Sequence, residues 1–168
     1  GEWGLGMRFR DKAISFPKQL TIGAIDDHNL IYQMGKEIAR QMRRIGIHVN
    51  FAPVVDVNNN AANPVINYRS FGEDKDNVTS KAYAYMKGMQ DGGLSACLKH
   101  FPGHGDTDVD SHHDLPIIRH SKHRLDSVEL APFRSLISLG ASGVMVAHLH
   151  VPAYDARENR ATTLSQSI

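Results

Sequence analysis

Residues 99–116, KHFPGHGDTDVDSHHDLP, concentrate imidazole and carboxylate side chains in a stretch that is too polar for a core. Within it, Asp110 and His112 are separated by one residue, so in an extended or turning backbone they can point to one side. A carboxylate there accepts a hydrogen bond from one imidazole nitrogen, fixes the tautomer and makes the other nitrogen more basic. Because an unperturbed histidine has a pKa of about 6.5, the pair is suited to transferring a proton near neutrality.

Two glycines, Gly103 and Gly105, give this segment a backbone that can turn sharply. A loop that moves can bring a proton-transfer pair over a bound substrate. An Asp-x-His pattern taken alone is more often part of a solvated loop than a catalytic pair. On the chemistry of these residues alone, both interpretations stay open.

Histidines elsewhere in the chain suggest a second chemistry. His148 and His150 form a His-x-His pair of the kind that can bind a metal ion, and with His100 they would make a metal-dependent hydrolase. Pro152 indicates that the strand is already ending at His150, which favours a lining or structural role. The remaining histidines near the segment are expected to be loop or surface residues: His104, His113, His120 and His123.

Short apolar runs alternate with helical patterns along the chain, and these elements must position the polar residues. Strands are expected at residues 20–25, 47–57, 94–101 and 141–149. Helices are expected from Asp26 or Asp27 to Gly46, over about 76–91, and over 121–140 with a bend near Pro132. The first helix has an apolar stripe at helical spacing: Leu30, Met34, Ile38, Met42 and Ile45. The second has inward positions at Val78, Ala82, Tyr85 and Met89.

Repeated alternation of strands and helices predicts parallel strands covered by helices, as a (β/α)8 barrel or an open doubly wound sheet. Asp56, the Lys99-His100 pair and His148 all come at the carboxyl ends of successive apolar strands. Barrel enzymes keep their active sites at that edge, so we favour an α/β (β/α)8 TIM-type barrel. Only about four strands are visible and a complete barrel needs roughly 250 residues, so we expect an incomplete portion of one.

Composition narrows the class of protein. The chain has 168 residues, 41% of them hydrophobic, which suits one domain with a packed core. A net charge of +1 argues against binding to nucleic acid or to a membrane surface through a basic face. No run of apolar residues is long enough to span a membrane. The single cysteine, Cys97, excludes an internal disulfide and leaves the compartment open.

The segment from Lys99 to His112 also resembles a family signature: Lys-His-Phe-Pro-Gly-His-Gly, four free positions, then Asp-Ser-His. It is the signature of the bacterial β-N-acetylglucosaminidases (β-N-acetylhexosaminidases) of glycoside hydrolase family 3. Three further stretches agree in order with the barrel domain of that family: FAPVVDV at 51–57, NPVINYRSFGED at 63–74 and GVMVAHLHVPAYD at 143–155. The resemblance covers essentially the whole chain, so residues 1–168 are expected to be part of the family's N-terminal catalytic domain.

The resemblance implies roles for individual residues. His112 would be the general acid/base and Asp110 its partner. The implied sugar-binding residues are Lys99, His100, Arg69, Asp56 and Arg8. Other interpretations stay open, namely a buried ion pair for Lys99, a loop tie through backbone carbonyls for Arg69, and a brace for the following loop for Asp56. No metal or organic cofactor is implied.

The chain departs from the family pattern in two places. The family usually has Asp-x-Glu-Gly-Gly after its second strand; Glu2 aligns with the Glu, Trp3 replaces a glycine, and the substrate-binding Asp would fall before residue 1. The family's nucleophile is an Asp on a strand that we expect beyond residue 168. The chain is therefore expected to hold the acid/base loop and part of the sugar site without the nucleophile.

The first hypothesis is a retaining glycosidase that acts on terminal β-linked N-acetylglucosamine, with the rest of the barrel in the parent protein. A relative using phosphate as the acceptor would be a phosphorylase. The alternatives are a catalytically inactive sugar-binding or scaffold domain and, ranked last, the metal-dependent hydrolase. The sequence leaves the natural substrate open among cell-wall muropeptides, chitin fragments and host glycans. It also leaves open whether the compartment is a bacterial cytoplasm or periplasm.

Overall fold

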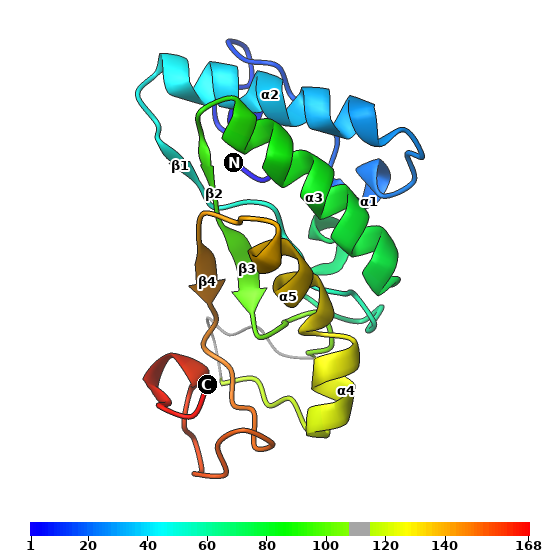
Figure 1. Cartoon of the computed structure of the whole chain (residues 1–168), viewed down its shortest axis with the longest axis vertical. Helices are drawn as coiled ribbons and strands as arrows, with labels where there is room; N and C mark the ends of the chain where they lie inside the picture. The colour runs from blue at the N-terminus through cyan, green and yellow to red at the C-terminus, as the bar shows by residue number, and fades with distance from the viewer. Residues whose placement is uncertain (108–114) are drawn as a thin grey trace.

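The computed structural model describes residues 1–107 and 115–168, and it combines helices with short parallel strands (Figure 1). The strands are β1 (Val49–Asn50), β2 (Ser95–Ala96), β3 (Leu98–Phe101) and β4 (Val144–Val146). The α-helices are α1 (Gln19–Ile22), α2 (His28–Arg44), α3 (Lys75–Asp91), α4 (Lys122–Ser127) and α5 (Ala131–Ser138). Three 3-10 turns complete the described elements: η1 (Leu5–Met7), η2 (Asn67–Arg69) and η3 (Thr162–Leu164).

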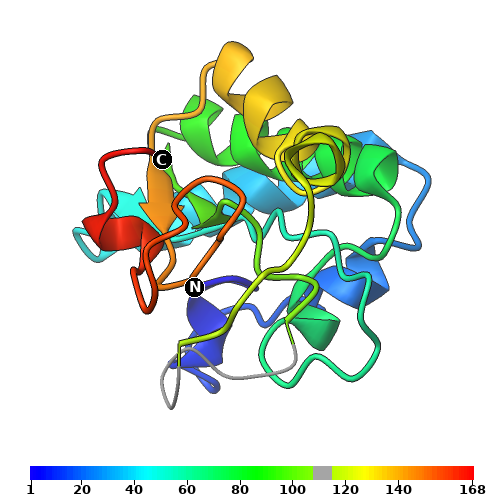
Figure 2. The ribbon, with the colours of Figure 1, turned by 90° about the horizontal axis from the view of Figure 1, so that it is seen from below.

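Both described strand pairs are parallel, as the alternation of strands and helices predicts. β1 pairs with β2, and β3 pairs with β4. An isolated parallel bridge between Val54 and Lys99 pairs the chain after β1 with β3. The chain after β1 and the end of β3 therefore lie side by side, which brings the carboxyl ends of two strands to one edge. Figure 2, seen from the end towards which β3 and β4 point, places α3, α4 and α5 on the same side of the strands.

The helix α2 begins where the sequence predicts it. The Asp27 side chain accepts a hydrogen bond of 2.8 Å from the Asn29 backbone N–H, which satisfies one of the free donors of the first turn. The buried face contains Ile31, Met34, Ile38 and Met42. The stripe was predicted wrongly at its two ends, because Leu30 is 57% exposed and Ile45 51% exposed.

The helix α3 confirms all four of its predicted inward positions, Val78, Ala82, Tyr85 and Met89, which are fully buried. It packs against α2 through glycines: a Cβ on Gly88 would lie 2.1 Å from the Tyr32 carbonyl oxygen, and one on Gly35 2.6 Å from the Tyr85 carbonyl oxygen. This close contact between the two helices determines which face of α2 is buried. Leu30 lies outside that face.

The first predicted strand, residues 20–25, is wrong. The chain forms the short helix α1 there, and the Gln19 side chain pairs with the backbone of Val54, donating to its carbonyl at 2.9 Å and accepting from its N–H at 3.2 Å. A short apolar run does not distinguish a strand from a buried helical turn. The strand predicted over 47–57 is shorter than expected: β1 ends at Asn50, where the Ala52 N–H donates back to the Asn50 carbonyl at 2.8 Å, and Val54 forms an isolated bridge.

The predicted helix over 121–140 is two helices, with residues 128–130 between α4 and α5. Pro132 lies in the first turn of α5, where its missing N–H breaks no helical hydrogen bond, so it starts the second helix rather than bending a single one. The main core lies between α2, α3, α5 and the strands. A smaller core forms around Leu125 and Leu149. Among the described residues, no helix is long and apolar enough to cross a membrane.

Candidate active site

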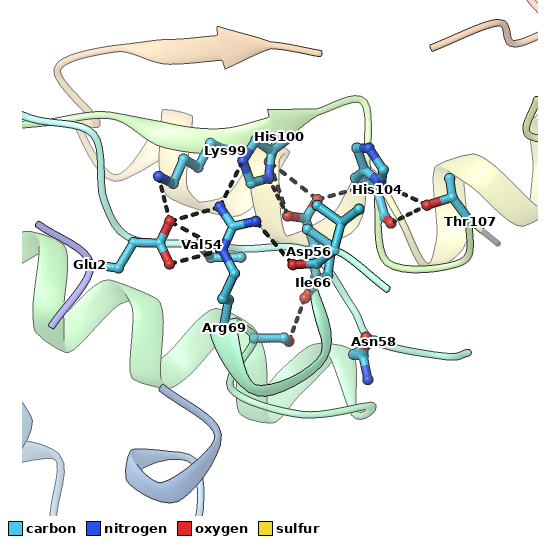
Figure 3. A network of polar contacts seen from close by, with 12 residues as sticks. Glu2, Val54, Asp56, Asn58, Ile66, Arg69, Lys99, His100, His104 and Thr107 are labelled. Atoms are coloured by element: carbon cyan, nitrogen blue, oxygen red, sulfur yellow. Dashed lines mark hydrogen bonds and ion pairs between the residues drawn. The ribbon is translucent and has the colours of Figure 1, made fainter. Parts of the chain in front are cut away.

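A buried carboxylate, Glu2, joins two basic side chains beside the end of β3 (Figure 3). Lys99 Nζ lies 2.7 Å from Glu2 Oε1, and Arg69 NH2 lies 2.7 Å from the same oxygen. Arg69 Nε donates to Glu2 Oε2 at 3.0 Å, so the guanidinium binds the carboxylate through two of its nitrogens. Arg69 NH1 also donates to the Val65 carbonyl at 3.0 Å, which ties down the loop that contains η2.

The charge on Glu2 is stabilised by these partners. Burial alone would raise the pKa of Glu2, but the hydrogen bonds from Arg69 and the attraction of Lys99 outweigh it and lower the pKa to about 2. Glu2 is 6% exposed, and Lys99 is 8% exposed. The carboxylate is therefore ionised at neutral pH, and it holds both cations in fixed positions.

A second buried carboxylate, Asp56, holds His100. Asp56 is fully buried, and its Oδ2 lies 2.7 Å from His100 Nδ1. On the other side of the ring, His100 Nε2 lies 3.3 Å from Arg69 NH2. Because a carboxylate only accepts and a guanidinium only donates, these contacts place the imidazole proton on Nδ1 and leave the Nε2 lone pair towards Arg69.

Asp56 also fixes the backbone that leaves β3. The backbone N–H groups of His100 and His104 donate to its Oδ1 at 3.1 Å and 2.7 Å. Burial acts to raise the pKa of Asp56, but the attraction and hydrogen bonds of His100 and the backbone bonds prevail, so the pKa is lowered. Because Asp56 is fully buried, its contacts hold the His100 ring and the backbone after β3 in position.

The first residues of the histidine-rich segment are packed tightly. His104 lies in a loop, as expected, but it is 2% exposed, so the expectation of a surface position is wrong, and burial lowers the pKa of its ring. Its Nδ1 lies 2.7 Å from Thr107 Oγ1, and its carbonyl accepts from Asn63 Nδ2 at 2.8 Å. A Cβ on Gly105 would lie 1.8 Å from the Val57 carbonyl oxygen. Gly105 is therefore required by close packing.

The predicted site residues fall into three groups. Lys99, His100, Arg69 and Asp56 are brought together in the network just described. Arg8 is exposed at the end of η1, and none of the network's contacts among the described residues involves it. Asp110 and His112 lie outside the described residues, so their proton-transfer roles stay predictions.

The histidines of the lowest-ranked alternative, a metal-dependent hydrolase, do not converge. The ring of His148 is exposed and its Nδ1 lies 2.7 Å from Thr163 Oγ1, whereas His150 is buried and neither ring nitrogen has a partner among the described residues. In the part of the chain that the structure describes, His100, His148 and His150 do not form a group within metal-binding distance. Both His148 and His150 come after the end of β4, so the regular alternation of a strand does not place them on one face.

Sequence reasoning missed the part that Glu2 plays. Its alignment with a family glutamate predicts no contact with Lys99 or Arg69. The available signal was a basic residue, Lys99, inside a predicted strand, because a buried cation needs an anionic partner; in the structure Lys99 is buried and Arg69 is partly buried. Tyr85, from α3, adds a support that periodicity cannot show: its hydroxyl donates to the Glu2 backbone carbonyl at 3.0 Å.

Comparison with known proteins identifies close relatives. The Beta-hexosaminidase A of Pseudoalteromonas piscicida is 43% identical over 150 residues, which cover 87% of this chain and 25% of that protein. A Beta-hexosaminidase of Thiobacillus denitrificans is 37% identical over 162 residues, covering 93% of this chain and 45% of that protein. The chain thus spans less than half the length of these curated relatives.

A solved structure shares the fold. The glycoside hydrolase family 3 beta-N-acetylglucosaminidase from Paenibacillus sp. str. FPU-7 superposes with a TM-score of 0.90 at 42% identity, over 94% of this chain and 30% of that one. The expected fold class is confirmed, and the parallel strands and helices described above are part of a (β/α) barrel. Residues 1–168 match the family described as "Glycosyl hydrolase family 3 N terminal domain". This chain belongs to glycoside hydrolase family 3.

Proposed function

We propose that this chain carries the acid/base loop and part of the sugar-binding site of a retaining β-N-acetylglucosaminidase. The observation that carries the proposal is the network of Glu2, Arg69, Lys99, His100 and Asp56 at the strand edge from which the Asp110–His112 segment departs. Active sites of barrel enzymes lie at that edge. The names of the relatives, hexosaminidases and a β-N-acetylglucosaminidase, support the same substrate class.

The proposed sugar contacts come from Lys99, Arg69 and His100, whose Nε2 would exchange its 3.3 Å contact with Arg69 for a sugar hydroxyl. An ammonium has three N–H donors, and Glu2 accepts from Lys99 through a single contact of 2.7 Å. The Arg69 side chain is 21% exposed, and its NH1 uses one donor on the Val65 carbonyl. Donors therefore remain on both side chains for sugar hydroxyls. Fixing these donors before the sugar arrives lowers the entropy lost on binding.

Asp56 is proposed as a positioning residue. It is fully buried, so it acts on the sugar through others: it orients the His100 ring and holds the His104 backbone at the start of the segment. Arg8 stays a proposed sugar contact from the family resemblance; it is exposed at the end of η1 and shares none of the network's contacts among the described residues.

In the proposed reaction, a carboxylate expected beyond residue 168 attacks the anomeric carbon while His112 gives its proton to the leaving oxygen. The bond to the leaving group breaks, and a glycosyl–enzyme bond forms. His112, now neutral, takes a proton from water, whose oxygen displaces the carboxylate and releases the sugar with its configuration retained. Asp110 would keep the imidazole in the required orientation and stabilise its charged form.

The test uses the full-length protein that contains this chain and an aryl β-N-acetylglucosaminide, with the product observed by proton NMR during the first minutes. We expect the β-anomer of N-acetylglucosamine to appear first and the α-anomer only later, by mutarotation. Appearance of the α-anomer first would refute the double displacement.

The same samples test the acceptor and the inactive alternative. Replacing the buffer by inorganic phosphate should leave free N-acetylglucosamine as the product, whereas formation of the sugar 1-phosphate would identify a phosphorylase. Saturable binding of an N-acetylglucosamine oligomer without turnover would instead establish the sugar-binding domain and overturn the proposed activity.

A further inference from the structure

A second cluster of chemistry-bearing side chains shares no residue with the proposed sugar site. It contains Asp106 from the turn after β3, His120 from the segment before α4, and Glu129 from the turn between α4 and α5. One potential ligand atom from each residue lies within 4.8 Å of the other two. His120 Nε2 and Asp106 Oδ2 are already in contact at 2.6 Å. Three segments that are separated in the sequence therefore meet at these side chains.

The environment of Glu129 points to a missing partner. Its side chain is 1% exposed, and its Oε1 accepts from Asn59 Nδ2 at 3.2 Å and contacts Arg124 NH2 at 3.2 Å. Its Oε2 is buried and, within residues 1–107 and 115–168, has no hydrogen-bond partner. A buried carboxylate oxygen without a partner loses its hydration and gains nothing in return, which is rare in folded proteins.

The backbone of the turn after β3 packs on the stem of the Glu129 side chain. Gly103 has a φ of +125°, and a Cβ there would lie 2.8 Å from the Cβ of Glu129. The turn after β3 therefore packs directly on the Glu129 side chain. This packing buries Glu129 and keeps Asp106, three residues further along, close to it.

The charges of the cluster leave a place for a cation. Glu129 and Asp106 are both carboxylic acids, and Arg124 is the cation recorded on Glu129. With both carboxylates ionised and His120 neutral, the group has one negative charge more than positive. Burying an uncompensated negative charge on Glu129 is unfavourable, so the site favours a bound cation.

We propose that Asp106, His120 and Glu129 form a binding site for a divalent transition-metal ion, with Zn²⁺ the best match. Two carboxylate oxygens and one imidazole nitrogen are ligand types that Zn²⁺ accepts, whereas Mg²⁺ and Ca²⁺ prefer oxygen ligands throughout. Three protein ligands leave a fourth tetrahedral position for water. For the metal to bind His120 Nε2, the proton in the contact with Asp106 must move to Nδ1 or be released.

A metal at this position would connect the turn after β3 to the turns that flank α4. Asp106 is four residues before Asp110 in the sequence, so the site would anchor one end of the segment that contains the proposed acid/base pair. The inference does not depend on the proposed glycosidase activity, because the cluster shares no residue with the sugar site.

The experiment is a titration of the metal-free full-length protein with Zn²⁺ by isothermal calorimetry, with thermal melting in parallel. We expect one Zn²⁺ per chain at this site and a melting temperature that rises with the free Zn²⁺ concentration. His120→Gln and Glu129→Gln should each weaken this binding at least tenfold and abolish the rise. The control His123→Gln changes an exposed histidine on α4 and should leave both unchanged.

Two safeguards keep the test decisive. Asp106→Asn removes a partly exposed ligand with little change of shape. It can replace the Glu129 variant in this test if that variant does not fold. His112→Ala removes the imidazole that is proposed as the acid/base, and Zn²⁺ binding at the cluster of Asp106, His120 and Glu129 should be unchanged. No Zn²⁺ binding, or binding that the cluster variants do not weaken, would overturn the proposal.

Discussion

Replacing the buried carboxylate of Glu2 by an amide tests the network that orders the proposed sugar site. In Glu2→Gln the shape is kept, but Lys99 and Arg69 lose the anion that they share at 2.7 Å. The pKa of Glu2 is lowered from 4.5 to about 2 in the folded protein. At about 1.4 kcal/mol per pKa unit, the charged form contributes about 3 kcal/mol to stability at neutral pH.

The sign of the pH dependence follows from the depressed pKa. The contribution is fully present above the unfolded value of 4.5 and is lost as the pH falls towards 2. By about pH 3 less than half of it remains. The free energy of unfolding should therefore differ between Glu2→Gln and the wild type by about 3 kcal/mol or more at pH 7, and by clearly less at pH 3.

Urea unfolding followed by circular dichroism at pH 7, 5, 4 and 3 measures this difference. The control is Glu37→Gln, which removes a glutamate paired with Arg40 on the surface of α2, where that Arg side chain is 62% exposed. An exposed pair contributes about 0–1 kcal/mol, so the control should change stability little. A difference below about 1 kcal/mol for Glu2→Gln, unchanged between pH 7 and 3, would refute the buried ion-pair network.

Three further substitutions probe the packing and the brace. Gly88→Ala places a Cβ 2.1 Å from the Tyr32 carbonyl oxygen, so α2 and α3 must separate; we expect a loss of about 1–3 kcal/mol in urea unfolding, and wild-type stability would contradict it. Gly105→Ala places a Cβ 1.8 Å from the Val57 carbonyl oxygen and should lower kcat/KM of the full-length protein through a displaced loop, with undiminished kcat/KM as the contrary result. Asp56→Asn retains the volume of a fully buried side chain, but its amide NH₂ would face backbone N–H donors that need an acceptor. We expect kcat/KM to fall at least tenfold while the pH optimum stays unchanged. A shifted pH optimum would instead indicate a direct proton-transfer role.

The sequence predicts the longer elements well because their signals are local. Asp27 and Asp74 begin α2 and α3 by accepting hydrogen bonds from backbone N–H groups of the first turn, as their types suggest. The inward positions of α3, such as Val78 and Tyr85, follow from helical spacing. The exposed ends of the α2 stripe were mispredicted because the contact with α3 through Gly35 and Gly88 is tertiary.

The short elements were harder to predict for physical reasons. Residues 20–25 carry an apolar run that suits a strand or a buried turn, and the choice is made by Gln19, whose side chain pairs with the backbone of Val54 far along the chain. Pro132 was expected to bend one helix, but at the first turn of α5 it begins a new one.

The site residues could be predicted as a set but their contacts could not. Strand-end positions and the family motif bring together Asp56, Arg69, Lys99 and His100. The identity of their partners depends on the three-dimensional fold, as the link from Glu2 to Lys99 shows. The cluster of Asp106, His120 and Glu129 has no sequence signal at all, since its members come from three different turns.

The central claim is that His112 supplies the proton to the leaving oxygen, and its most direct test is the dependence of kcat/KM on the leaving group. Aryl β-N-acetylglucosaminides with phenols of graded pKa are compared on the full-length wild type and His112→Ala. We predict a loss of about 10²–10⁴-fold for the variant with weakly acidic phenols and near wild-type rates with the most acidic phenol, which needs no protonation. An equal, small effect on every substrate would contradict the claim.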